Sequence, residues 1–80
     1  MDATYKEKLI WYATAPRATA GKLTQYENGN FVTYWAGKLR GTFVTIGGEF
    51  KFNNKLDAIK LARRYRESCA EELAKEVGLE

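Results

Sequence analysis

The sequence predicts an α+β fold in which a four-stranded antiparallel meander packs against a long C-terminal helix and a short N-terminal helix precedes the sheet. Two observations carry this prediction. Runs rich in Val, Thr, Phe, Tyr, Trp and Ile are separated by two-residue turn signals, and helical spacing of apolar residues occurs on both sides of these runs. We expect the 80 residues to form a single compact domain, near the lower size limit for a core without disulfides or metal.

The N-terminal helix is expected over residues 4–13. Thr4 and Glu7 have the spacing of a capping box, in which each side chain bonds the backbone N–H of the other residue. Helical spacing then places three apolar residues on one side, namely Tyr5, Leu9 and Tyr12. Residues 14–21 are expected to connect this helix to the sheet.

The meander is expected over residues 22–52, with turns at Asn28-Gly29, Gly37-Lys38 and Gly47-Gly48. Asn-Gly suits a type I′ turn because both central residues need positive φ, and Gly-Lys suits a type II′ turn, which needs glycine first. The predicted strands are 22–27, 30–36, 39–46 and 49–52.

Two-residue turns fix the strand register, so each side chain can be assigned to one face of the sheet. The face expected to form the core carries Leu23, Val32, Tyr34, Ala36, Leu39, Phe43, Phe50 and Phe52. The second face carries Lys22, Tyr26, Phe31, Trp35, Arg40, Val44, Ile46 and Lys51. In this register Tyr26 opposes Phe31 and Trp35 opposes Arg40, so that each pair shares a face.

The C-terminal helix is expected over residues 55–77, with Asn54 as the N-cap and Gly78 just beyond the end. Its expected core stripe is Ala58, Ala62, Tyr65, Cys69 and Leu73. Its outward side carries Lys60, Arg63 and Arg64, which together with Arg66 make a basic cluster.

The composition excludes several classes of chemistry. The chain has no histidine and one cysteine, Cys69, which argues against an internal disulfide, against the usual metal sites and for a reducing compartment. Gly21-Lys22 does not belong to a phosphate loop, because Pro16 stands where that motif needs glycine. We therefore expect no catalytic residue, metal, cofactor or small-molecule substrate, and we interpret the chain as a non-enzyme.

Charge and targeting signals bear on the partner and the compartment. Residues 1–66 carry 12 Lys/Arg against 5 Asp/Glu, a net +7, whereas residues 67–80 carry a net −4. A basic body suits phosphates or an acidic protein patch. The chain start lacks a secretory pattern, and the apolar run over residues 9–13 is too short to span a membrane, so a cytoplasmic protein without membrane contact is expected.

Two surfaces are candidates for binding a partner: the second sheet face and the basic cluster of the C-terminal helix. Trp35 beside Arg40 would form a cation–π pair with the large contact area typical of binding hot spots. The candidate partner-binding residues are Tyr26, Trp35, Arg40, Lys51, Lys60, Arg63 and Arg64. An alternative remains open, in which the N-terminal helix folds over the second face and buries Trp35.

A small antiparallel sheet followed by one C-terminal helix resembles the DNA-binding arm domains of phage integrases, as does Phe52-Asn53-Asn54 leading into an alanine-bearing helix. Fold resemblance does not carry function. The first interpretation is a small binding protein that modulates or inhibits a larger macromolecule by protein–protein contact, such as a phage or mobile-element accessory protein of anti-CRISPR type. The alternative is a nucleic-acid-binding module with a basic, aromatic surface, a protein partner being favoured over nucleic acid.

Overall fold

The computed structural model describes residues 3–76 and Gly78, and within them it contains two helices and one three-stranded antiparallel sheet. In chain order the elements are α1 (Ala3–Ala13), β1 (Ala18–Glu27), β2 (Asn30–Leu39), β3 (Thr42–Phe43) and α2 (Lys55–Glu76). The α+β class, the short N-terminal helix and the long C-terminal helix are confirmed. The predicted fourth strand is not confirmed.

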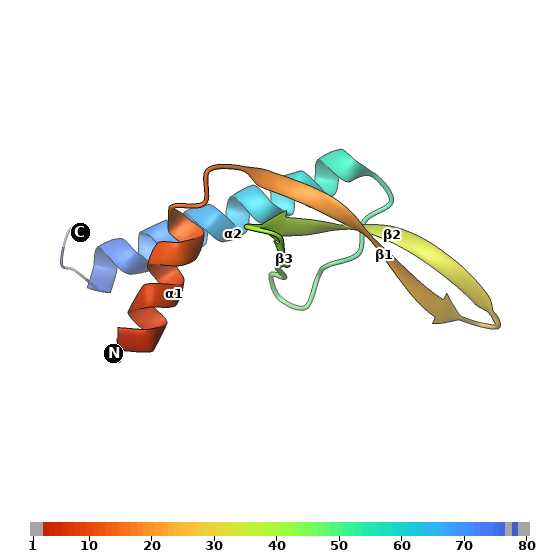
Figure 1. Ribbon diagram of the computed structural model, residues 1–80, viewed down its shortest axis with the longest axis horizontal. Coiled ribbons are helices and arrows are strands. Elements are labelled where there is room, and N and C mark those ends of the chain that lie inside the picture. Colours follow the sequence, from red (N-terminus) through yellow and green to blue (C-terminus); the bar gives the residue numbers. More distant parts are fainter. Residues whose placement is uncertain (1–2, 77, 79–80) are drawn as a thin grey trace.

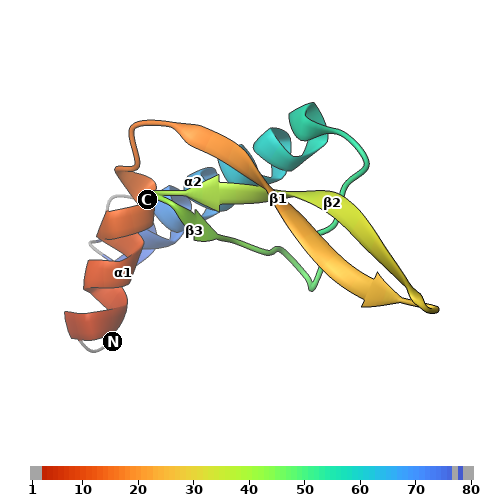
Figure 2. The ribbon, with the colours of Figure 1, turned by 45° about the vertical axis from the view of Figure 1, so that its right-hand side comes forward.

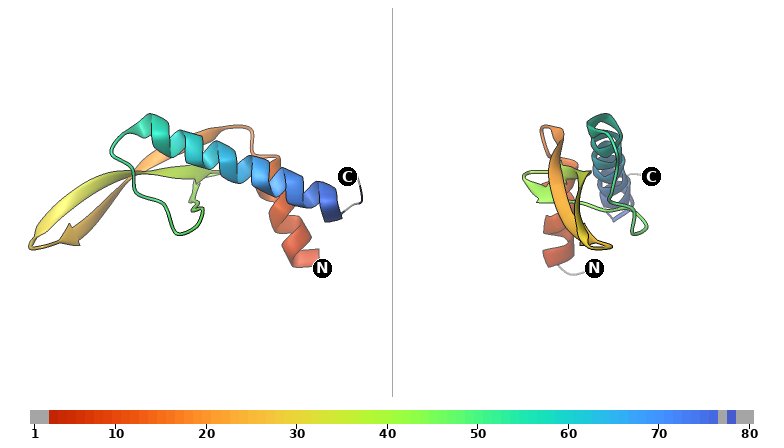
Figure 3. Two further views of the ribbon diagram at one scale, coloured as in Figure 1. Left: turned by 180° about the vertical axis from the view of Figure 1, so that it is seen from behind. Right: turned by 90° about the vertical axis from the view of Figure 1, so that its right-hand side faces the viewer.

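The elements form two layers. Helix α2 is one layer, and the sheet and α1 lie side by side against it, the sheet along its first half and α1 along its second half (Figures 1 and 3). The molecule is elongated, with principal-axis extents of 50 × 23 × 19 Å. Much of this length comes from the β1–β2 hairpin, whose far end extends past the start of α2 (Figures 1 and 2). We call residues 22–35, which form this end of the hairpin, the arm.

Helix α2 begins where the sequence predicts. The side-chain oxygen of Asn54 accepts a hydrogen bond from the backbone N–H of Asp57 at 2.9 Å, and the Asn54 amide donates to the Asp57 carboxylate at 2.9 Å. This N-cap satisfies one of the free N–H groups of the first turn. Gly78 follows the helix with φ of +75°, as expected for a residue beyond a helix end, and the expected last helical residue, Val77, lies outside the described residues.

Helix α1 packs on α2 and leaves the face of the arm uncovered. Leu9 is buried, and the rings of Tyr12 and Tyr65 meet edge to face at 5.3 Å. The alternative in which this helix covers the second sheet face is therefore wrong. The capping box predicted at Thr4 is also wrong, because the helix already includes Ala3 and Thr4 lies inside it.

Two of the three predicted turns are confirmed. Asn28 and Gly29 have φ of 49° and 83°, both positive as a type I′ turn requires, and the register Tyr26↔Phe31 follows from them. The Gly47-Gly48 turn also has positive φ at both residues and is closed by a bridge between Ile46 and Glu49.

The turn predicted at Gly37-Lys38 is wrong. Both residues lie within β2, and the chain reverses at Arg40-Gly41, where φ is 51° and 77°. Gly37 is needed for a different reason: a Cβ built on it would lie 2.6 Å from the backbone oxygen of Ala58 in α2. The glycine therefore allows the helix to approach the strand closely, a tertiary requirement that resembles a turn signal in the sequence.

The shifted turn changes the strand pairing of the residues that follow it. Leu39 pairs with Thr42, so the predicted opposition of Trp35 and Arg40 is wrong. After Phe43 the chain leaves the sheet, and it returns at Phe52, whose backbone exchanges hydrogen bonds of 2.8 and 2.9 Å with Trp35. Two isolated bridges, at Glu49 and at Phe52, thus stand where a fourth strand was expected.

The core lies between α2 and the inner part of the sheet. Its central members are Ala15, Leu39, Val44, Leu61 and Ala62. Ala36 and Leu39 are buried as predicted, whereas Phe43 is 44% exposed and Val44, assigned to the second face, is buried. The other residues predicted as core are only half-buried, namely Leu23, Val32, Tyr34, Phe50 and Phe52. No helix within the described residues has a stretch long and apolar enough to span a membrane.

Candidate functional site

The predicted binding residues of the sheet do not form one surface. Tyr26 and Trp35 lie on the same face of the arm. Tyr26 is paired with Phe31 across the hairpin, and Phe31 shares a face with Trp35, four positions further along β2. Lys51 lies on the opposite face, where its ammonium group is 3.3 Å from the side-chain oxygen of Gln25 and 5.1 Å from the ring centre of Tyr34. The expected grouping of Tyr26, Trp35, Arg40 and Lys51 is therefore wrong.

Arg40 connects the β2–β3 turn to the end of α1. Its Nε atom donates to the backbone oxygen of Trp11 at 2.7 Å, and Nη2 donates to the backbone and hydroxyl oxygens of Thr14 at 3.3 and 3.2 Å. The guanidinium also stacks 4.3 Å from the ring centre of Trp11. These contacts satisfy carbonyl groups that a helix end leaves free, so Arg40 acts as a structural clamp.

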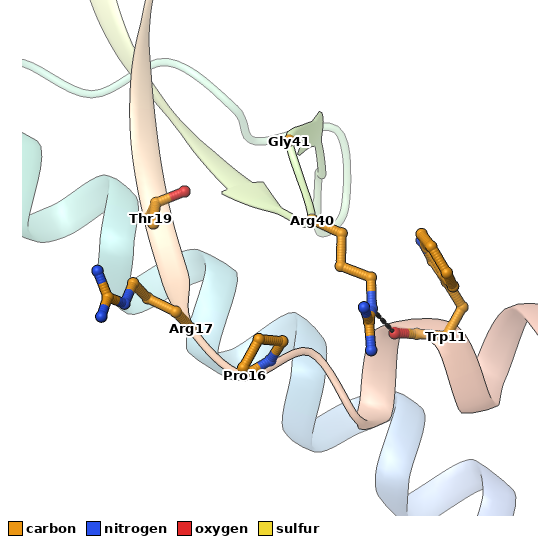
Figure 4. Close-up of a pocket in the computed structure, with 6 residues that line it drawn as sticks. All are labelled: Trp11, Pro16, Arg17, Thr19, Arg40 and Gly41. Carbon is orange, nitrogen blue, oxygen red and sulfur yellow. Dashed lines mark hydrogen bonds between the residues drawn. The ribbon is translucent and has the colours of Figure 1, made fainter.

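A shallow pocket of about 450 Å³ lies beside this clamp (Figure 4). Its lining residues are Trp11, Pro16, Arg17, Thr19, Arg40 and Gly41. Figure 4 shows that the guanidinium of Arg17 points away from that of Arg40. The two arginines therefore do not converge on one ligand position, and the donors of Arg40 are largely used within the protein.

The basic cluster of α2 is exposed in part. Lys60, Arg63 and Arg64 lie on the outward side of the helix, away from its buried residues. Arg66 differs from them, because its Nη1 atom donates to the backbone oxygen of Ala15 at 3.2 Å and so joins α2 to the segment after α1. Within the part of the chain that the structure describes, no aromatic ring lies over Lys60, Arg63 or Arg64.

The end of the arm carries two exposed aromatic rings. Tyr26 and Phe31 are 66% and 77% exposed, although they oppose each other across the hairpin. Their ring centres are 5.1 Å apart with an angle of 69° between the planes, an edge-to-face contact. The next pair inward, Thr24 and Thr33, is also exposed, and the two hydroxyl groups bond each other at 3.1 Å.

The base of the arm carries two lysines around one tryptophan. The Nζ atom of Lys22, which is paired with Trp35 across the hairpin, lies 5.6 Å from the centre of the Trp35 ring. The Nζ atom of Lys55, at the start of α2, lies 5.7 Å from the same ring. Both distances are within the range of a cation–π contact, so the half-buried indole contacts two exposed cations.

We call the surface made by these residues the arm face: Lys22, Thr24, Tyr26, Phe31, Thr33, Trp35 and Lys55. None of its members is acidic. The nearest carboxylate of the hairpin, Glu27, alternates to the opposite face, where a hydrogen bond to Glu27, with burial, raises the pKa of Tyr34. The arm face thus combines positive charge and exposed aromatic rings with no negative charge of its own.

The sequence predicts four of these residues on one candidate face, Lys22, Tyr26, Phe31 and Trp35, although only Tyr26 and Trp35 are among the named binding residues. The Asn28-Gly29 turn pairs Phe31 with Tyr26 and Lys22 with Trp35. Lys55 comes next to Trp35 only through the packing of α2 on the sheet. No local pattern in the sequence indicates that contact.

Cys69 lies in a second, smaller pocket of about 210 Å³ between the two helices. The thiol is buried, and this burial raises its pKa above the ordinary value. A thiol with a raised pKa stays protonated at neutral pH and is a poor nucleophile. Among the described residues, no three side chains of the His, Cys, Asp or Glu type gather closely enough to hold a metal ion.

Comparisons with known protein families, with curated proteins and with solved structures gave no match. The topological resemblance to phage-integrase arm domains therefore gains no support from them.

Proposed function

We propose that this protein is a non-enzymatic nucleic-acid-binding module and that the arm face is its contact surface. The observation that carries the proposal is the pair Lys22 and Lys55, held around Trp35 on a surface that has exposed aromatic rings and no carboxylate. Phosphate contacts by lysine supply most of the affinity for nucleic acids, and aromatic rings supply stacking. An acidic residue on the same surface would repel the phosphates.

This proposal reverses the order of the two interpretations that the sequence favours. The protein-contact interpretation placed its hot spot at Trp35 and Arg40, residues that the nucleic-acid alternative also used. The guanidinium of Arg40 instead bonds the end of α1, and Trp35 is half-buried and in contact with two lysines. The support for a protein hot spot at this position is therefore weaker than the support for a phosphate-binding surface.

Protein contact remains the second candidate, in which the chain modulates or inhibits a larger partner as a phage or mobile-element accessory protein would. One observation favours it. Tyr26 and Phe31 extend from the end of the arm with more than half of their surface exposed, and aromatic side chains of this kind often anchor in a partner's pocket.

The experiment that separates the two candidates is a salt titration of binding. A fluorescein-labelled oligonucleotide, single-stranded or duplex, is titrated with the protein at ~50 mM and ~200 mM salt, and fluorescence anisotropy is recorded. Affinity should fall steeply with salt because bound phosphates release counterions. The double variant Lys22→Gln with Lys55→Gln should weaken binding to every oligonucleotide.

The matched control is Lys6→Gln with Lys75→Gln, which removes the same charge from two exposed lysines of the helices. It should retain most of the affinity. If no oligonucleotide binds at ~50 mM salt, where non-specific electrostatic binding is strong, the nucleic-acid function is excluded. The protein-contact candidate would then be tested by cross-linking to nuclease-treated lysate, with a Tyr26→Ser and Phe31→Ser variant for comparison.

A further inference from the structure

The chemistry of the arm face distinguishes between the forms of nucleic acid that it could bind. The inference drawn from it rests on the proposed function and concerns whether the bound nucleic acid is single-stranded or double-stranded. The relevant contacts lie at two positions along the arm: the aromatic pair at its end and the lysines at its base.

The arm face offers ring faces at the end of the arm. Two amide side chains there lie outside this face: Asn28 belongs to the turn, and Asn30, paired with Glu27, belongs to the opposite face. Tyr26 and Phe31 are exposed and contact each other edge to face, so the broad side of at least one ring is open to solvent. Bidentate contacts to base edges come from Arg, Asn and Gln side chains, and the arm face has none of these. The hydroxyl groups of Thr24 and Thr33 bond each other.

Exposed ring faces can be used only by bases whose own faces are accessible. In a duplex each base is covered by its neighbours, whereas in a single strand the bases can turn outward and stack on aromatic side chains. The chemistry at the end of the arm therefore matches a single strand. It also predicts little sequence preference, because every base has a π-face.

The lysines are placed to hold the backbone of the same strand. Trp35 lies four positions after Phe31 along β2, which corresponds to ~13 Å at the rise of a β-strand. A nucleic-acid strand covers this distance in roughly four nucleotides at a stacked spacing of 3.4 Å, and in fewer when it is extended. Bases at the end of the arm and phosphates at its base can therefore belong to one short segment.

We propose that the arm face binds single-stranded nucleic acid, with bases stacked on Phe31 and Tyr26 and backbone phosphates bound by Lys22 and Lys55. In this arrangement Trp35 is a positioning residue, because its ring contacts both ammonium groups. The proposed path runs from the far end of the hairpin towards the start of α2, and Figures 1 and 2 show where these two parts of the chain lie.

The test compares single strands with a duplex of equal length. Labelled oligothymidine, oligouridine and the DNA duplex are titrated with the full chain by fluorescence anisotropy at ~50 mM salt. Either single strand should bind about tenfold or more tightly than the duplex. Phe31→Leu, which keeps an apolar side chain but removes the ring, should lower the affinity for the single strands about tenfold and leave the affinity for the duplex unchanged.

Phe43→Leu is the matched control, because Phe43 is also an exposed phenylalanine but belongs to the opposite face of the sheet, beside Lys38. It should leave single-strand binding unchanged. The variant with Lys22→Gln and Lys55→Gln should reduce the slope of log affinity against log salt by about 1.4, since each phosphate contact to a single strand contributes about 0.7. Circular dichroism of each variant checks that its fold is retained.

The outcomes separate the inference from the function on which it rests. A duplex that binds as tightly as the single strands, or a Phe31→Leu variant with wild-type affinity, would overturn the single-strand inference while nucleic-acid binding stands. Absence of binding to all three oligonucleotides would overturn both. A single-strand preference that is lost with Phe31→Leu and kept with Phe43→Leu supports the inference.

Discussion

Substitution of Gly37 by alanine tests the close contact between α2 and the sheet. A Cβ at this position would lie 2.6 Å from the backbone oxygen of Ala58 and 3.2 Å from both the backbone N and the Cβ of Ala62. Ordinary contacts begin near 3.4 Å, so the helix or the strand would have to move by about 0.8 Å. Two of these three atoms are backbone and the third is an alanine Cβ, so no rotamer change can relieve the clash.

The magnitude follows from the cost of overpacking. Forcing an extra methyl group into a packed contact typically costs ~1–3 kcal/mol, and a gap of ~0.5–1 Å along the rest of the interface forfeits a quarter to a half of each contact. Leu39 and Leu61, both fully buried, lie at this interface. We therefore expect a loss of about 3 kcal/mol from the free energy of unfolding, out of a total of roughly 4–12 kcal/mol for a chain of this length.

The assay is thermal and urea unfolding followed by circular dichroism. At an unfolding entropy of about 2.1 cal/mol/K per residue, a loss of 3 kcal/mol lowers Tm by about 18 °C for the whole chain. Gly21→Ala is the matched control: its Cβ would meet the Cδ atom of the flexible Lys38 side chain at 2.8 Å, which can move aside. This variant should melt within about 3 °C of the wild type.

A second control separates the helix contact from the turn that the sequence indicates. Gly41 has φ of +77°, so Gly41→Ala should cost about 1–2 kcal/mol through backbone strain alone. If Gly37→Ala melted within about 3 °C of the wild type, the placement of β2 against α2 would be refuted. If Gly41→Ala were neutral, the placement of the second turn would be refuted.

Three further predictions concern the contacts that hold the two helices. Arg40→Asn keeps a side chain that tolerates positive φ but removes the bonds to Trp11 and to the end of α1, so urea unfolding should show a loss of ~1–2 kcal/mol. Asn54→Ala removes the N-cap of α2 and should cost ~1 kcal/mol in the same assay. A hydrogen bond to the Glu72 carboxylate, 2.5 Å long, raises the pKa of Tyr5 to about 12 from 10.0, so the stability it contributes is complete below about pH 10 and is lost as the pH rises through about 12. Glu72→Gln should return the titration of Tyr5 towards 10, as measured by the ultraviolet absorbance of tyrosinate.

The candidate site shows which kinds of inference a sequence supports. The pairing of Tyr26 with Phe31 and of Lys22 with Trp35 follows from the Asn28-Gly29 turn, whose geometry is local. The role of Arg40 could not be predicted in this way. Its guanidinium is taken up by the end of α1, nearly thirty residues earlier in the chain, and no periodicity relates the two positions.

Local chemistry therefore determined the α+β class, the N-cap at Asn54, two of the three turns and the register of the arm, because each depends on residues within a few positions of one another. The tertiary structure alone decided the remaining features. Gly37 serves the approach of α2 and not a turn, and Lys55 reaches Trp35 only because that helix packs on the sheet. Both depend on contacts between distant segments, whose geometry is set by the packing of whole elements and leaves no local pattern in the sequence.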